Sequence, residues 1–200
     1  MKTILSISIS LFFSAQIFSQ VSYQRIANAE NEPGNWLTYS GNYSSTRFSP
    51  LQQINTNNVQ KLAPVWIYQL RNPQGPFETT PIVADKIMYI SEPPSTVTAL
   101  DVATGRKIWT YTPDMPKDVK FLGFGPVNRG VAILDNNVYI GTLDAHLICL
   151  DAKSGALKWS ASVGDNKLGY AITCAPVAID GKIIIGISGG EAGIRGFLDA

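Results

Sequence analysis

The sequence predicts an all-β protein of the β-propeller class, and a long internal repeat is the main reason. Residues 99–109 (ALDVATGRKIW) return fifty positions later as 149–159 (CLDAKSGALKW), with Leu, Asp, Gly and Trp in the same places. An Asp, a Tyr and an Ile of the preceding strand keep the same spacing. Short strands repeated at a period near fifty are typical of propellers and solenoids, in which neighbouring units bury one another's cores.

The composition is that of a folded globular chain. Hydrophobic residues make up 45% of the sequence and charged residues 16%, which argues against disorder. The formal net charge is +1, and the basic residues form no dense stretch. We therefore expect no nucleic-acid partner.

Residues 1–20 predict a secretory signal that is not part of the fold. Lys2 precedes a short apolar run over 4–13, and small and polar residues follow over 14–20. Such a segment is too short to span a membrane, and we place its cleavage near Ser19 or Gln20. The signal carries no Cys, so we expect no lipid anchor at that site. Because its apolar run is short, we also expect no transmembrane segment.

Export would place the two cysteines in an oxidising compartment. Cys149 and Cys174 could therefore form a disulfide there. Each lies in an apolar strand pattern, however, and a small buried thiol is the more common state of such a residue. We favour two free cysteines.

Residues 21–63 are polar and rich in turn signals, which predicts an irregular lead-in. Within it, Thr56 is a candidate N-cap for a short helix that ends at Leu62. Residues 64–70 (PVWIYQL) then predict a strand. Trp66 in this strand resembles the closing Trp of an earlier, degenerate repeat.

Residues 64–200 predict an incomplete propeller of about three repeats. From residue 79 onward, runs of β-branched and aromatic residues alternate with Asp-containing turns, and no amphipathic helical pattern occurs. The expected strands are 82–83, 87–91, 97–100, 108–111, 131–134, 138–141, 146–150 and 157–161.

The third repeat contains an insertion. Asp85 and Asp135 each precede the closing Asp of their repeat by 16 positions, whereas Asp180 precedes Asp199 by 19. The three extra residues fall within 188–196 (SGGEAGIRG). Glycines in a strand permit a bulge or the close approach of a ligand, and a carboxylate is a hard ligand for a cation. A longer surface hairpin with a solvated Glu explains the spacing equally well.

Taken together, these residues resemble the pyrroloquinoline quinone (PQQ)-dependent alcohol dehydrogenases, the type I quinoprotein family. The resemblance covers about residues 35–200. It implies an eight-bladed propeller, of which about the first three blades are present, with PQQ and Ca²⁺ or a lanthanide on the axis. It rests on the tryptophan-docking repeats and on 35–50 (NWLTYSGNYSSTRFSP), 77–81 (FETTP), 125–132 (GPVNRGVA), 173–176 (TCAP) and 188–196.

The resemblance also implies roles for individual residues. PQQ carries three carboxylates and an ortho-quinone, so it requires N–H and hydroxyl donors and a charged fork such as Arg. Glu191 matches a metal-binding carboxylate, and the bound ion would polarise the quinone oxygen. The cofactor-binding candidates are Glu78 at the PQQ edge, Arg129 at the quinone oxygens, Thr173 at a carboxylate, and the strip Ser188, Gly189 and Gly190.

The sequence departs from the family pattern before residue 125. Alcohol-oxidising members usually carry two adjacent cysteines there, which form a disulfide over the PQQ, but this chain has Gly123 and Phe124. Phe124 is a candidate to cover the cofactor by stacking. The resemblance places the catalytic aspartate, a further metal ligand and the tryptophan floor beyond residue 200, so we expect residues 1–200 alone to be inactive.

The resemblance implies a periplasmic oxidoreductase. It would oxidise an alcohol, or a sugar or polyol, by hydride transfer to metal-bound PQQ and pass the electrons to cytochrome c or a quinone. One competing class is a non-catalytic propeller scaffold of the outer-membrane assembly type, which needs neither Arg129 nor the insertion. A sugar-binding lectin propeller is a third class, but it leaves the insertion unexplained.

Overall fold

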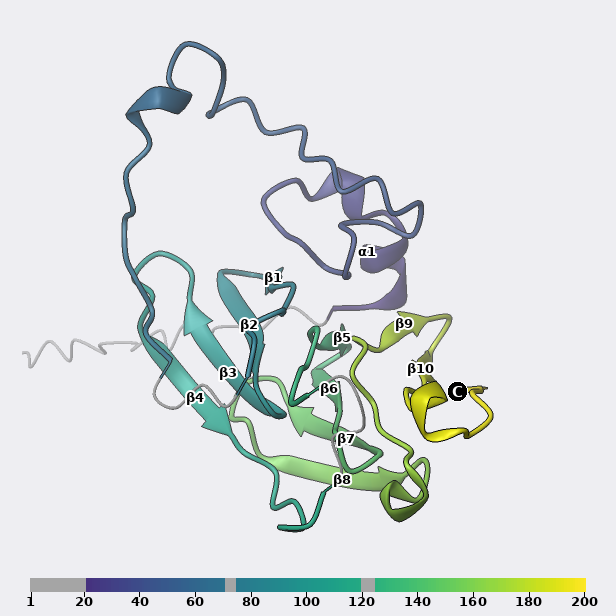
Figure 1. Cartoon of the computed structure of the whole chain (residues 1–200). Coiled ribbons are helices and arrows are strands. Elements are labelled where there is room, and N and C mark those ends of the chain that lie inside the picture. The colour runs from purple at the N-terminus through teal and green to yellow at the C-terminus, as the bar shows by residue number, and fades with distance from the viewer. Residues whose placement is uncertain (1–20, 71–74, 120–124) are drawn as a thin grey trace, which may run out of the picture.

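The computed structural model describes residues 21–70, 75–119 and 125–200. The expected signal segment, Gly123 and Phe124 lie outside the described residues. Strands are added in chain order to two four-stranded antiparallel sheets and one three-stranded sheet. In Figure 1, strands β1, β5 and β9 lie close together while β4 and β8 lie on the periphery, so the sheets radiate like propeller blades.

Short hairpins build each blade. Asp85, Lys86, Asp135 and Asp180 have positive φ in the turns after each inner strand, which tight hairpins require and Asp tolerates.

The first blade consists of β1 (Ile82–Ala84), β2 (Ile87–Glu92), β3 (Thr96–Asp101) and β4 (Lys107–Tyr111). The second consists of β5 (Ala132–Leu134), β6 (Asn137–Gly141), β7 (His146–Asp151) and β8 (Leu157–Ser162). The third consists of β9 (Val177–Ile179), β10 (Lys182–Gly186) and β11 (Leu198–Asp199).

Docked tryptophans join one blade to the next. The Trp109 indole donates Nε1–H to the Ala152 carbonyl at 3.0 Å, and its ring covers Gly155, where a Cβ would lie 2.5 Å from the ring. Trp66 makes the same contacts with the Val102 carbonyl, at 2.8 Å, and with Gly105. The expected equivalence of Trp66 and Trp109 is therefore confirmed.

Trp159 differs from these two residues in its surroundings. It contacts Tyr139 with ring centroids 5.9 Å apart, as Trp109 contacts Tyr89, but it is 43% exposed against 8% for Trp109. It faces no docking turn among the described residues. Of the three closing tryptophans, Trp66 and Trp109 therefore share one environment and Trp159 does not.

The segment 64–70 forms no strand. Trp66 docks as Trp109 of the outer strand β4 does. No described segment, however, pairs with the backbone of residues 64–70. A strand requires a partner for its N–H and C=O groups, so the segment stays irregular. The prediction of a helix capped by Thr56 is also wrong. Only a 3₁₀ turn, η2 (Val59–Lys61), forms, and Asn58 precedes it.

The strand register corrects the size of the insertion. Gly186 pairs with Leu198, twelve positions later, whereas Gly141 pairs with Leu147, six positions later. The insertion therefore has six residues rather than three. It contains the 3₁₀ turn η4 (Gly190–Ala192). Asp199 pairs with Ile185, the place that Ile148 holds in the second blade, so Asp199 is not the closing Asp of the docking motif.

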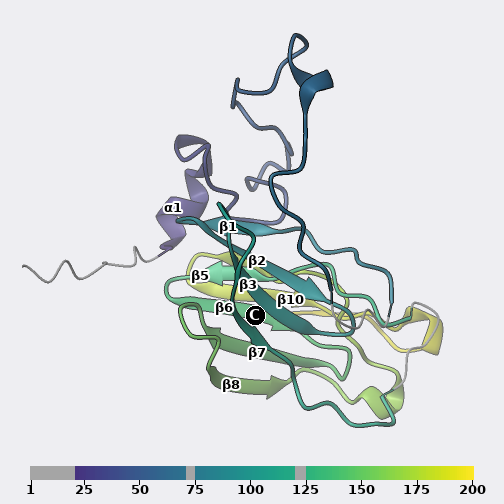
Figure 2. The same cartoon turned by 90° about the vertical axis from the view of Figure 1, so that its left-hand side faces the viewer.

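The lead-in fastens all three blades. Val21 forms a β-bridge with Asp135, and Trp36 forms one with Val83. The Tyr43 hydroxyl donates to the carbonyl of Ala178 in the third blade. Beside these contacts lie α1 (Tyr23–Ala27) and η1 (Ala29–Asn31), whereas residues 48–63 extend away from the sheets, as Figure 2 shows.

Both cysteines are free, as the sequence favoured, with Cys149 buried and Cys174 half-buried. Within the described parts of the chain, no helix is both long and apolar enough to cross a membrane.

Candidate functional site

Three chain segments, which contain Thr80, Arg129 and Thr173, meet beside the inner strands. Each segment immediately precedes the first strand of its blade, and their backbones hydrogen-bond to one another. The Thr80 N–H donates to the Arg129 carbonyl, and the Arg129 N–H donates to the Thr173 carbonyl, both at 3.0 Å. Arg129 is thus held from both sides, with Thr80 and Gly130 forming a parallel β-bridge.

The side chains of Arg129 and Glu78 form an ion pair at this junction. Arg129 Nη2 lies 3.0 Å from Glu78 Oε2, and the two side chains are 40% and 38% exposed. A guanidinium carries five N–H donors, so this contact leaves donors for another oxygen ligand. The structure therefore brings together the first two cofactor candidates, although they are 51 positions apart.

Thr173 and Ser188 extend the group into the third blade. Their hydroxyl oxygens are 2.7 Å apart, and either can donate the hydrogen bond. Ser188 is fixed by paired backbone hydrogen bonds with Ala171, of 2.8 and 3.1 Å. Thr173 is only 5% exposed. A continuous series of contacts therefore runs from Glu78 through Arg129 and Thr173 to Ser188.

The glycines after Ser188 make a close turn. Gly189 is buried at φ 130°, and a Cβ there would lie 2.3 Å from the Gly169 carbonyl oxygen, so only glycine fits. Gly190 has open space around its Cα. Glu191 lies on η4 and is exposed. No group of three or more His, Cys, Asp or Glu suited to a metal occurs among residues 21–70, 75–119 and 125–200.

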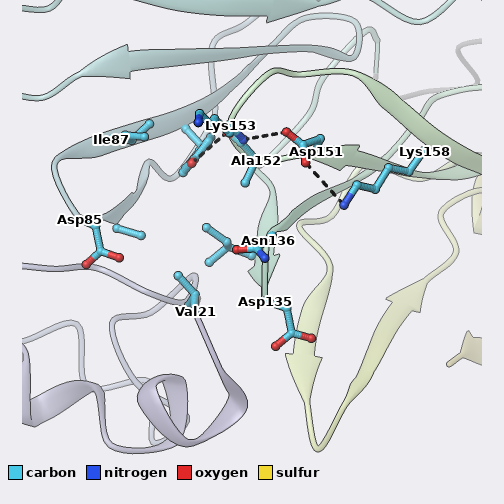
Figure 3. Close-up of a pocket in the computed structure, with 12 residues that line it drawn as sticks. Val21, Asp85, Ile87, Asp135, Asn136, Asp151, Ala152, Lys153 and Lys158 are labelled. Atoms are coloured by element: carbon cyan, nitrogen blue, oxygen red, sulfur yellow. Dashed lines mark hydrogen bonds and ion pairs between the residues drawn. The ribbon is translucent and has the colours of Figure 1, made fainter. Parts of the chain in front are cut away.

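A separate cavity of about 390 Å³ lies at the other end of the inner strands, between the first two blades. Figure 3 shows Asp85 and Asp135 in the turns beside it, with Val21 of the lead-in. Two of its three carboxylates already have partners, since Asp85 pairs with Arg25 and Asp151 lies 3.5 Å from Lys158. We assign this cavity to the packing between blades.

Comparison with known proteins decides the family. Residues 36–192 match the PQQ family described as glucose/ethanol/alcohol dehydrogenase, β-propeller domain. The chain belongs to the PQQ-dependent alcohol dehydrogenase family. Because the match covers most of the chain, the radiating sheets are blades of this family's propeller.

Individual relatives agree with the PQQ-dependent alcohol dehydrogenase assignment. Quinohemoprotein alcohol dehydrogenase ADH-IIG of Pseudomonas putida is 41% identical over 98% of this chain and 28% of its own length. The solved structure of ADHIIG from Pseudomonas putida HK5 superposes with a TM-score of 0.85 at 43% identity, over 92% of this chain and 27% of that one.

Two further relatives extend the comparison. The 1-butanol dehydrogenase (cytochrome c) of Thauera butanivorans is 42% identical over 84% of this chain and 24% of its own length. A europium-containing methanol dehydrogenase superposes with a TM-score of 0.81 at 34% identity, over 88% and 31% of the two chains. The chain thus spans about a quarter to a third of the length of these relatives.

Proposed function

We propose that the full-length protein is a periplasmic oxidoreductase that oxidises an alcohol by hydride transfer to metal-bound PQQ. A sugar or polyol is the alternative substrate class. The series of contacts from Glu78 to Ser188 carries this proposal, because it links candidate cofactor ligands from three blades. The relatives are named alcohol dehydrogenases, which disfavours a non-catalytic scaffold.

The donor set fits PQQ. A cofactor with three carboxylates and two quinone oxygens needs cationic and neutral donors side by side, and this junction offers both. Arg129 would bind and orient the quinone edge, and Thr173 and Ser188 would donate hydroxyl hydrogen bonds to a carboxylate. The turn at Gly189 and Gly190 would let backbone N–H groups approach closely. When bound, PQQ supplies a two-electron acceptor for hydride.

We assign Glu191 to the metal. A carboxylate suits Ca²⁺ and lanthanide ions equally, because both are hard cations. The other ligands would come from PQQ oxygens and from parts of the protein outside this chain. The europium-containing neighbour supports a trivalent ion as an alternative to Ca²⁺.

A cellular location and an electron acceptor complete the proposal. A periplasmic location rests on the signal-like residues 1–20. Transfer of electrons to cytochrome c is supported by the name of the Thauera relative, and a quinone is the other acceptor. Phe124 as a cover for PQQ stays a prediction.

The proposal is tested in the full-length protein by Arg129→Gln and Glu191→Ala. Loss of a hydrogen bond to a charged group costs about 1.5–3 kcal/mol, so Arg129→Gln should weaken PQQ binding about ten- to hundredfold in equilibrium dialysis. Glu191→Ala should abolish dye-linked alcohol oxidation at low Ca²⁺ or La³⁺. Glu30→Ala removes an exposed carboxylate of the lead-in and serves as the control. Unchanged PQQ affinity in Arg129→Gln would refute the site, and normal turnover of Glu191→Ala without added metal would remove Glu191 as a ligand.

A further inference from the structure

Asn128, which precedes Arg129, is completely buried. Its side-chain Nδ2 donates to the Gly141 carbonyl at the end of β6, at 2.8 Å. Its Oδ1 accepts from the Gly130 N–H at 3.1 Å. One amide therefore fixes the backbone on both sides of Arg129 and anchors it to a strand of the second blade.

The same residue is tied to the segment that carries Glu78. The Ser91 hydroxyl, which is also completely buried, donates to the Asn128 carbonyl at 3.4 Å and lies 3.0 Å from Thr79 Oγ1. The Ser91 N–H also donates to Thr79 Oγ1, at 3.0 Å. Thr79 directly follows Glu78. A buried polar network thus joins the neighbours of both partners in the ion pair.

The repeat itself does not require an amide at this position. Asn128 lies seven positions before Asp135, and the corresponding positions before Asp85 and Asp180 hold Glu78 and Thr173. The other two blades form their inner strands without an amide in this place. The network is therefore specific to the blade that supplies Arg129.

The physical role of the network follows from its burial. The Arg129–Glu78 pair is about 40% exposed, and exposed ion pairs fix side chains only weakly. Buried, fully satisfied hydrogen bonds are stronger and rigid. We propose that Asn128 is a positioning residue, which presents the Arg129 guanidinium to the quinone edge of PQQ through its bonds to Gly130 and Gly141. This inference rests on the proposed function.

The test compares matched variants of the full-length protein. Asn128→Ala removes both amide contacts, whereas Thr79→Val removes only the acceptor for Ser91 and keeps the side-chain shape. Thr142→Val is the control, because Thr142 is equally buried but its hydroxyl bonds within the β6–β7 turn, to Asp144 and His146. The readouts are PQQ affinity by equilibrium dialysis, the absorption spectrum of bound PQQ and the thermal midpoint.

We expect Asn128→Ala to weaken PQQ binding about tenfold and to shift the bound spectrum, and Thr79→Val to weaken it several-fold. Thr142→Val should lower the thermal midpoint without changing PQQ affinity. The loss in Asn128→Ala/Arg129→Gln should be no greater than in Arg129→Gln alone, because Asn128 acts through Arg129.

Two results would overturn the inference. One is unchanged PQQ affinity and spectrum in Asn128→Ala. If that variant does not fold, unchanged values in Asn128→Ser, whose side chain is too short to reach the Gly141 carbonyl, decide in the same way. The other is full additivity in the double variant, which would mean a purely structural role. Weakened binding in Arg129→Gln alongside either result would leave the proposed function standing, whereas unchanged binding in Arg129→Gln would refute that function itself.

Discussion

At the scale of single residues, Arg25 makes the most concentrated set of charged contacts in the lead-in. Its guanidinium donates two hydrogen bonds to Glu32, of 2.8 and 2.6 Å, and two to Asp85, of 3.0 and 2.8 Å. Its side chain is 19% exposed. Planar, bidentate pairing of this kind is the strong form of an ion pair. Arg25 therefore fastens α1 to the first blade.

This contact predicts an acid-dependent loss of stability. Hydrogen bonds from Arg25 lower the pKa of Glu32 below its ordinary 4.5, with a smaller contribution from Asn35. A carboxyl with a lowered pKa in the folded state stabilises the fold above its unfolded pKa, and this contribution is lost as the pH falls through the folded value. In the full-length protein, Arg25→Met should lose about 1–2 kcal/mol at pH 7.

Thermal melts between pH 7 and 3 measure this effect. The difference between wild type and Arg25→Met should shrink below pH 4.5, as Glu32 takes up its proton. Arg47→Met is the control, because Arg47 is exposed and lies 5.3 Å from the centre of the Tyr39 ring rather than against a carboxylate. A constant difference at every pH would contradict the argument.

At the scale of elements, the docked Trp109 ring leaves no room for a side chain at Gly155. This glycine has a φ of 72°, and the indole ring occupies the place where a Cβ would lie. Gly181 has a φ of 73°, but no atom lies within 4 Å of the place that a Cβ would take there. The two turns therefore differ in the docking contact and not in backbone strain.

The pair Gly155→Ala and Gly181→Ala separates these two effects. Both substitutions should cost about 1–2 kcal/mol for a left-handed backbone. Gly155→Ala should cost about 1–3 kcal/mol more, because the Trp109 ring must shift. Thermal midpoints and the quenching of Trp fluorescence in the full-length protein measure the difference. Equal midpoints would show that the docking contact contributes nothing to stability.

At the scale of the whole molecule, segment 65–70, in which exposed and half-buried residues alternate, predicts where the ring of blades closes. Trp66 docks on the first blade just as Trp109 docks on the second, yet Val65 is 88% and Ile67 83% exposed. Apolar side chains on an unpaired backbone are typical of an unfilled interface. We expect this segment to become the outer strand of a blade whose other strands come from later in the full-length protein.

Hydrogen–deuterium exchange of the full-length protein tests this expectation. The amides of residues 66–69 should be protected to the same extent as those of β4, because both would belong to outer strands. Residues 51–58, which extend from the sheets in Figure 2, provide the exchanging reference. Exchange of residues 66–69 as fast as that reference would contradict closure at this point.

The sequence alone determined the features that repeat. The fifty-residue period established the all-β blades and the docking place of Trp109, and the place of Trp66 followed from its likeness to that residue. These features depend on local turns and on side-chain alternation, which the sequence displays directly. The family and its cofactor also followed from short motifs, and the comparisons confirmed the family.

Only the tertiary structure decided how distant segments pair. The length of the insertion came from the pairing of Gly186 with Leu198, because spacing alone could not tell which Asp belonged to the docking motif. The sequence assigned no role to Asn128, because the role proposed for it rests on a hydrogen bond to Gly141 in another strand. Strand register and buried polar networks depend on contacts across the fold, and residue types in a local window do not specify those contacts.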